Sequence, residues 1–263
     1  LNAGNSITSG GNFNVVVGDE AGTAITTGDR NIAVGFEAGT AISTGGENVA
    51  IGYQALATED EHGLNIAIGS EALENQNAGA DASNVAVGHN AGKNVTTGTN
   101  NVIIGGLAGD ALTDADANVA IGKSALSADT LGSKSIAIGL GTLQTQNFTT
   151  ATDGFNVGVG HGVGASITTG TQNTLIGAEA GDALTDADFN VAIGTSALTA
   201  DTLGSRSVAI GRRTLHAQNL TTATEVYNTA VGFEAGNDIT TGVENALFGA
   251  LAGDALTDAD FNT

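Results

Sequence analysis

A five-residue motif, Asn-Val-Ala-Ile-Gly, recurs along the whole chain and constrains the fold more than any other feature. Fourteen complete copies occur in 263 residues, and most begin 17 residues after the previous one. Short, fixed periods of this kind indicate a solenoid, in which each repeat forms one coil and packs on its neighbours. The motif copies begin at Asn14, Asn31, Asn48, Asn65, Asn84, Asn101, Asn118, Ser135, Asn156, Asn173, Asn190, Ser207, Asn228 and Asn245.

Four successive coils form a larger unit, which we call a super-repeat. Position 1 of a coil is the Asn or Ser that opens the motif, and the four coils are called first to fourth. The fourth coils have longer tails, so the super-repeat measures 70 residues in its first full copy and 72 afterwards. Residues 1–13 match residues 143–155 and read as the end of a truncated repeat, so we expect a segment of a longer protein. The divisions are 1–13, 14–83, 84–155, 156–227 and the partial 228–263.

The motif itself predicts a short β-strand. Positions 2 and 4 are large and β-branched, and alternate residues of a strand share a face. We therefore expect positions 2 and 4 to line the interior of the coil, together with position 8 and the Leu found at position 9 of third and fourth coils. Position 5 is Gly in every copy, which indicates a positive φ or a close backbone approach. The predicted fold is an all-β solenoid or β-roll with about 17 residues per coil.

Position 3 lies on the opposite face of this strand and is nevertheless apolar. A continuous apolar column on an outer face is unusual for a monomer. We expect it to be buried against identical chains in a parallel homo-oligomer, a trimer or higher. A wider coil that takes both faces inside is the alternative. The predicted interface residues are Ala86, Ile103, Ala120, Ala137, Leu175, Ala192, Ala209 and Leu247.

Composition narrows the possible partners. The formal net charge is −21, with 28 acidic and only seven Lys or Arg residues, which argues against nucleic acid because phosphate binding needs basic clusters. The chain has no Cys, so it has no disulfide framework and no zinc–thiolate site. It has no Pro, which suits strands paired on both sides. No apolar stretch is long enough to span a membrane.

Aspartates in the second coils are the candidate metal ligands. Three carboxylates within seven residues of a turn repel one another unless they share a cation, and Ca²⁺ prefers oxygen ligands. Two other interpretations stay open: the side chains cap turns through hydrogen bonds to the backbone, or they are simply solvated. The candidate Ca²⁺ ligands are Asp110, Asp114, Asp116, Asp182, Asp186, Asp188, Asp254, Asp258 and Asp260.

Other chemistry-bearing residues follow the repeat. Position 1 is almost always Asn, and Asn stacked at one height predicts an amide ladder between coils. Acidic residues at position 7 read as a solvated row rather than as acid–base pairs, and no catalytic role is expected. Aromatic residues that precede position 1, such as Phe155 and Tyr227, are expected to cover coil corners; if exposed, they are candidate sugar-stacking positions. The Thr-Thr-Gly turns occur on one coil in four, too sparsely for an ice-binding ladder.

The repeated Asn-Val-Ala-Ile-Gly-x-x-Ala pattern resembles the β-roll repeats in the heads of trimeric autotransporter adhesins. It is also similar to the Asn-Thr-Ala-Val-Gly arrays of phage tail fibres and giant bacterial surface filament proteins, a form that residues 228–232 nearly reproduce. The resemblance implies a secreted or virion-borne parallel homo-oligomer that works in attachment.

We therefore expect a non-enzymatic, structural segment of an extracellular adhesive fibre, on a bacterial cell surface or a virion, that acts as a stiff stalk. Its expected partners are identical chains and a glycan or protein on a target cell surface. A phage tail fibre or a depolymerase-type glycan-binding module is the alternative.

Overall fold

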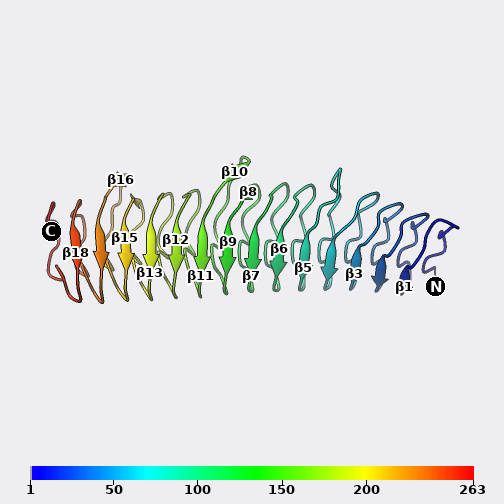
Figure 1. Cartoon of the computed structure of the whole chain (residues 1–263), viewed down its shortest axis with the longest axis horizontal. Coiled ribbons are helices and arrows are strands. Elements are labelled where there is room, and N and C mark those ends of the chain that lie inside the picture. Colours follow the sequence, from blue (N-terminus) through cyan, green and yellow to red (C-terminus); the bar gives the residue numbers. More distant parts are fainter. Residues whose placement is uncertain (1) are drawn as a thin grey trace. The chain divides into compact units, whose positions relative to one another are not determined.

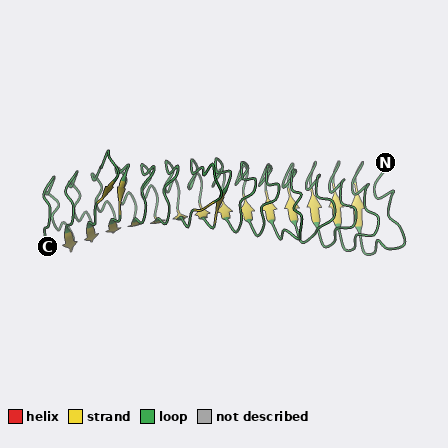
Figure 2. Ribbon diagram, turned by 90° about the horizontal axis from the view of Figure 1, so that it is seen from above, coloured by secondary structure: helices red, strands yellow, loops and turns green. Residues whose placement is uncertain are grey.

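The computed structural model describes residues 2–263, and these residues form strands, turns and loops without a helix (Figure 2). The chain divides into two compact units. Unit 1 extends to Ser133 and also contains Thr149–Ala151, and unit 2 comprises Lys134–Phe148 and Thr152–Thr263. Each unit is described below by itself. The predicted all-β solenoid with coils of about 17 residues is confirmed.

Seven parallel strands of three residues form the sheet of unit 1. They pair in chain order, as their parallel arrows show (Figure 1). Val15 of one strand lies opposite Ile32 of the next, an offset of one coil, and the longer fourth coil places Ile66 opposite Val85. The strands are β1 (Val15–Val17), β2 (Ile32–Val34), β3 (Val49–Ile51), β4 (Ile66–Ile68), β5 (Val85–Val87), β6 (Val102–Ile104) and β7 (Val119–Ile121), followed by the two-residue β8 (Gly132–Ser133).

Unit 2 repeats this arrangement with seven further parallel three-residue strands. The tails of the coils add short strands, of which β14 and β16 pair with each other in parallel. The strands are β9 (Ile136–Ile138), β10 (Thr152–Asp153), β11 (Val157–Val159), β12 (Thr174–Ile176), β13 (Val191–Ile193), β14 (Gly204–Ser205), β15 (Val208–Ile210), β16 (Thr224–Glu225), β17 (Thr229–Val231) and β18 (Ala246–Phe248).

The two faces of each strand are the reverse of those predicted. The middle residue of the strand, position 3, points into the coil, whereas positions 2 and 4 point outward and are partly or largely exposed. The predicted outward column is therefore wrong. Its members Ala86, Ile103, Ala120, Ala137, Leu175, Ala192 and Ala209 are completely buried within the chain, and Leu247 is 6% exposed.

Packing inside the coil explains this reversal. The strand forms one wall of the coil, and the buried Ala at position 8 lies on the wall opposite it. These two walls lie close together, so a small side chain at position 3 fits between them. The large residues Ile103 and Leu175 occur where position 9 is Gly. A Cβ added to Gly92 would lie 2.8 Å from Cδ1 of Ile103, and one added to Gly181 would lie 2.9 Å from Cδ2 of Leu175. The 72-residue recurrence of large residues at position 3 thus reflects core filling and not an interface.

The column of Asn residues at position 1 ties each coil both to itself and to the next. Asn31 donates from Nδ2 to the carbonyl of Gly45, which closes its own coil, at 2.8 Å. Its Oδ1 accepts the backbone N–H of Asn48 in the next coil at 3.0 Å. The predicted ladder is therefore present, although in most of its rungs a backbone N–H donates to the side-chain amide oxygen of the preceding coil. Since Asn31 and Asn48 are completely buried, these bonds satisfy polar groups that have no access to water.

The invariant Gly at position 5 is explained by a close backbone approach. Gly35 has a φ of 137°, and a Cβ placed on it would lie 2.3 Å from the carbonyl oxygen of Gly52 in the next coil. Backbone cannot move aside as a side chain can, so any other residue would separate the coils at this corner.

Candidate functional site: the outer sheet faces

Two columns of apolar side chains cover the outer face of the sheet in each unit. They come from positions 2 and 4 of every coil, and all but four of these residues are Val or Ile. The exceptions are Thr174, Thr229, Ala246 and Phe248. No member carries a charge. Adjacent members shield one another, so that Ile104 and Ile138 are 37% and 36% exposed, whereas Phe248 is 69% exposed.

These columns form a long strip, which we call the outer strip. Seven strands about 4.8 Å apart give it a length of roughly 34 Å in each unit. Its two columns stand about 6.6 Å apart, so that each unit presents roughly 340 Å² of apolar surface when the side-chain width is included. This area is a little under half of the ~800 Å² that each partner contributes to a standard protein interface.

Aromatic and cationic side chains border the outer strip. Phe36 and Tyr53 come from position 6 of successive coils and stack with their ring centroids 5.7 Å apart. At the other border, the guanidinium of Arg206 lies 4.6 Å from the ring centroid of Phe189. The aromatic residues before position 1 are exposed: Phe155 is 50% exposed and Tyr227 49%. Exposure was the condition for treating them as candidate sugar-stacking positions. Such amphipathic rings are typical of the margins of protein interfaces.

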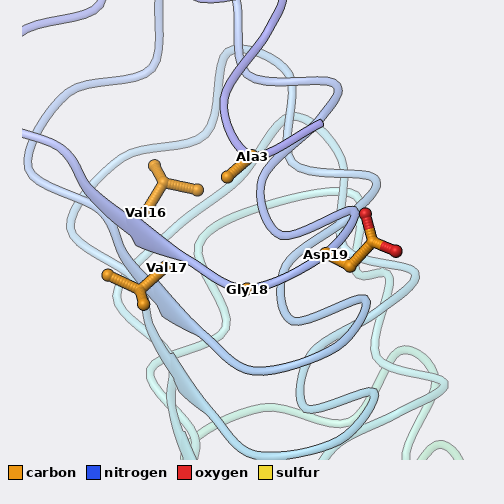
Figure 3. A pocket seen from close by; sticks show the side chains of 5 residues that line it. All are labelled: Ala3, Val16, Val17, Gly18 and Asp19. Carbon is orange, nitrogen blue, oxygen red and sulfur yellow. The ribbon is translucent and has the colours of Figure 1, made fainter. Parts of the chain in front are cut away.

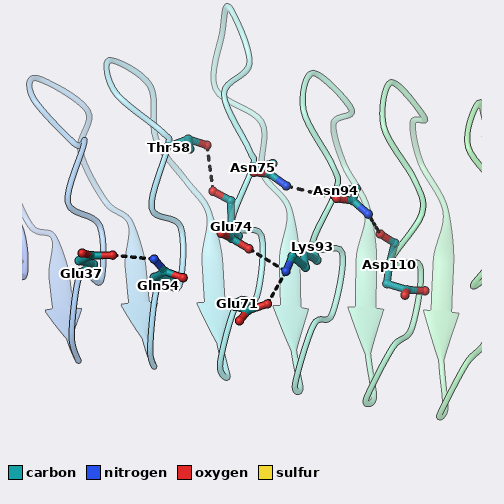
Figure 4. Close-up of polar contacts among 9 residues, drawn as sticks. All are labelled: Glu37, Gln54, Thr58, Glu71, Glu74, Asn75, Lys93, Asn94 and Asp110. Atoms are coloured by element: carbon teal, nitrogen blue, oxygen red, sulfur yellow. Dashed lines mark hydrogen bonds and ion pairs between the residues drawn. The ribbon is translucent and has the colours of Figure 1, made fainter.

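Polar contacts link successive coils along another side of unit 1 (Figure 4). The amide Nε2 of Gln54 donates to Oε2 of Glu37 in the preceding coil at 2.6 Å. The ammonium group of Lys93 contacts both Glu71 and Glu74 of the preceding coil, and Glu71 is the closer partner. Glu37 and Glu71 stand at position 7, in the row predicted to be solvated, whereas Glu74 stands at position 10. They reinforce contacts between neighbouring coils, each of which contributes modestly because the groups remain partly exposed.

Five of the nine predicted Ca²⁺ ligands contact the preceding coil rather than one common point, and Asp182 accepts a hydrogen bond from Oγ1 of Thr199 in the following coil. Oδ1 of Asp114 accepts a hydrogen bond from Oγ1 of Thr97 at 2.6 Å, and Oδ1 of Asp116 accepts the backbone N–H of Thr99 at 2.7 Å. The same contacts recur between Asp186 and Thr169 and between Asp188 and Thr171, and Asp260 accepts the backbone N–H of Val243.

Asp110 lies apart from these turns, and burial raises the pKa of its carboxyl. This geometry favours the turn-capping interpretation. Calcium binding stays a prediction.

An open hollow of about 580 Å³ lies beside β1 (Figure 3). It is lined by Ala3, Val16, Val17, Gly18 and Asp19. Val16 is partly exposed here, whereas its equivalent Ala33 in the next coil is buried. The hollow is therefore an uncovered section of the coil interior, and its single carboxylate gives it no convergent set of polar groups.

One cluster of possible metal ligands was not predicted from the sequence. Glu59, Asp60 and His62 bring possible metal-ligand atoms within 4.8 Å of one another, and no other group of three in residues 2–263 does so. The sequence does contain a signal for it. The other third coils have Asp-Thr-Leu-Gly at the equivalent positions, 129–132 and 201–204, whereas residues 59–62 are Glu-Asp-Glu-His. The other histidines are dispersed, and burial lowers the pKa of His216.

Comparison with known proteins gives no assignment: no protein-family model, no curated protein and no solved structure matches this chain. Within residues 2–263 there is no helix of the length and apolarity needed to cross a membrane.

Proposed function

We propose that this chain is a structural stalk segment of an extracellular adhesive fibre, in which the outer strips of identical parallel chains pack against one another. The observation that supports this proposal best is the outer strip itself. It is uncharged, continuous over seven strands in each unit, and bordered by aromatic residues. Contiguous apolar patches of a few hundred Å² often mark protein interaction sites.

A second copy of the chain is the partner that this surface suits. The strip repeats at every coil, so parallel chains in register place equivalent Val and Ile residues at equal heights. In a ring of three or more parallel chains, the position-4 column of every strip can face the common axis, where each residue lies beside its own copies. The net charge of −21 acts against association at low salt, so the apolar contact has to outweigh this repulsion.

Replacing Ile104 and Ile138 together with Asp tests the interface. Both side chains point outward and contribute little to the interior of the coil, so the coils should remain folded. We expect monomers by light scattering, with an unchanged circular dichroism spectrum. The matched control replaces Ser124 with Asp at position 7, outside the strip, and should remain oligomeric. An intact oligomer in the double variant would contradict the proposal.

The direction of packing can be tested by cysteine cross-linking because the natural chain has no Cys. Ile104→Cys and Ile193→Cys would be made separately. In parallel chains each single variant should form a disulfide with its own copy, since equal heights bring Cβ atoms within the ~3.5–4.5 Å that a disulfide requires. If neither single variant cross-links but a mixture of the two does, the chains are antiparallel.

Deletion of residues 84–155 tests the role as a stalk. The deletion removes one complete super-repeat and joins Ser83 to Asn156, which matches the natural junction of a fourth coil with a first coil. We expect a folded oligomer that is shorter by roughly 19 Å, the rise of four strands. A shortened protein that fails to fold or to associate would show that the coils are not interchangeable spacer elements.

A glycan-binding role is the second candidate, favoured by the exposed rings of Phe155, Phe189 and Tyr227. Arg206 already covers part of the rings of Phe189 and Tyr227. Binding to a glycan array that disappears in a Phe189→Ala, Tyr227→Ala variant would support this role, provided that the variant remains oligomeric.

A further inference from the structure

Each third coil buries a carboxylate at position 12. These carboxylates belong to Glu59, Asp129 and Asp201, and all three residues are completely buried. Asp201 shows how the fold satisfies such a group. Its Oδ1 accepts the backbone N–H groups of Gly204 and Leu220, both at 3.0 Å, and its Oδ2 accepts Nε2 of Gln218 at 2.5 Å.

Glu59 lacks this set of donors. Among residues 2–263 it accepts the backbone N–H of His62 at 3.3 Å and Nδ2 of Asn65 at 3.5 Å, which are both long hydrogen bonds. Gln76 occupies the place of Gln218, but its Nε2 has no hydrogen-bond partner. A buried carboxylate with so little compensation is costly in free energy, and burial raises the pKa of Glu59 accordingly.

The residues beside Glu59 differ from the repeat in a way that supplies metal ligands. Asp60 stands where the other third coils have Thr130 and Thr202, and His62 stands where they have Gly132 and Gly204. Nδ1 of His62 is inaccessible to solvent and has no hydrogen-bond partner. One ligand atom from each of Glu59, Asp60 and His62 lies within 4.8 Å of the others.

We propose that Glu59, Asp60 and His62 bind one divalent first-row transition-metal ion, with Zn²⁺ as the probe. An imidazole together with two carboxylates is a donor set that Zn²⁺ accepts, whereas Ca²⁺ and Mg²⁺ prefer oxygen alone. In a tetrahedral Zn²⁺ site the ligand atoms stand roughly 3.4 Å apart, so small side-chain rotations close the site. The cation would neutralise the buried Glu59 carboxylate and connect both ends of the turn, which goes beyond a stalk function.

The test uses the full chain without an affinity tag, prepared free of metal with a chelator and titrated with Zn²⁺ by calorimetry. We expect one tight site per chain. Zn²⁺ should raise the thermal midpoint and slow amide hydrogen exchange at residues 59–63. His62→Gly introduces the residue found in the other third coils and should abolish the tight site. Asp60→Thr, matched in the same way, should weaken binding roughly tenfold or more.

Two controls keep the interpretation clear. The exposed His161, replaced with Ala, should leave binding unchanged. The metal-free His62→Gly protein should show the circular dichroism spectrum of the natural chain, so that lost binding is not lost folding. The proposal is overturned if the natural chain has no tight Zn²⁺ site, or if His62→Gly keeps it. Neither result would bear on the outer strip, because Glu59, Asp60 and His62 lie outside it.

Discussion

First and second coils fill the interior with one kind of side chain, and third and fourth coils fill it with another. In the second coil that begins at Asn173, position 9 is Gly181 and position 12 is the buried Leu184. In the following third coil, the buried Leu198 comes from position 9 and Asp201 occupies position 12. A Cβ on Gly181 would lie 2.8 Å from Cδ1 of Leu184, so one coil has room for one large side chain from either position.

The difference shows that a solenoid core can be apolar in one pair of coils and polar in the next. When Leu enters from position 9, position 12 becomes free to hold a hydrogen-bonding group. Asp201 and Gln218 then bind each other and the tail of the fourth coil through the N–H of Leu220. The buried polar pair therefore anchors the longer tail, which the apolar coils do not need.

Removal of the large side chain inside either kind of coil should lower the free energy of unfolding most. Leu198→Ala leaves a cavity in a closely packed coil and should lower the free energy of unfolding by about 2–5 kcal/mol, as should Leu184→Ala in the apolar coil. The measurement is urea unfolding followed by circular dichroism. Leu140→Ala is the control, since Leu140 is 54% exposed and its loss should change little. A small effect at Leu198 would mean that the coils do not depend on this side chain.

Loss of the hydrogen bonds between Asp201 and Gln218 should lower the free energy of unfolding less than loss of a large core side chain. Gln218→Ala removes the hydrogen bond that Nε2 donates to the carboxylate of Asp201 and the one that Oε1 accepts from Nδ2 of Asn228, and should destabilise the protein by about 1–3 kcal/mol. Hydrogen exchange at Leu220 should increase, because the tail loses part of its anchor. If exchange at Leu220 is unchanged, the pair does not hold the tail.

Glu59 should respond to pH in the opposite sense from a satisfied carboxylate. Its pKa is raised by burial, so the folded state resists ionisation and loses stability as the pH rises through the folded pKa. With chelator present, Glu59→Gln should therefore be more stable than the natural chain at pH 7, and this gain should vanish below the ordinary carboxyl pKa of 4.5. Equal stability of the variant and the natural chain at pH 7 would show that Glu59 is adequately compensated.

The smallest effect is expected at the exposed turn carboxylates. Asp114→Asn retains an acceptor for Oγ1 of Thr97 and should change stability by no more than about 0.5 kcal/mol if the group only caps a turn. A calcium chelator should then leave the thermal midpoint unchanged. A large drop with chelator that Ca²⁺ reverses and Zn²⁺ does not would instead support the calcium hypothesis for these aspartates.

The repeat period gave the coil length, the strand positions and the Asn ladder, since each depends on residues that recur at a fixed spacing. It did not give the inner face of the strand. The alternation of residues along a strand separates its two faces but does not say which face is inside. The large residues at positions 2 and 4 wrongly suggested that their face lines the interior. The sequence shows that the large Ile103 occurs where position 9 is Gly92 in the preceding coil and Gly109 in its own coil. Only the distances in the structure show that Ile103 fills the space left by these glycines.

What the sequence by itself determined is therefore the repeating unit: fourteen strand-forming motifs, their spacing and the Gly that each corner requires. The structure alone decided which side of each strand is enclosed, because the narrow gap between the walls admits Ala and excludes two β-branched columns. It also decided which departures from the repeat meet in space, as Glu59, Asp60 and His62 do, because turn geometry and burial bring those atoms together.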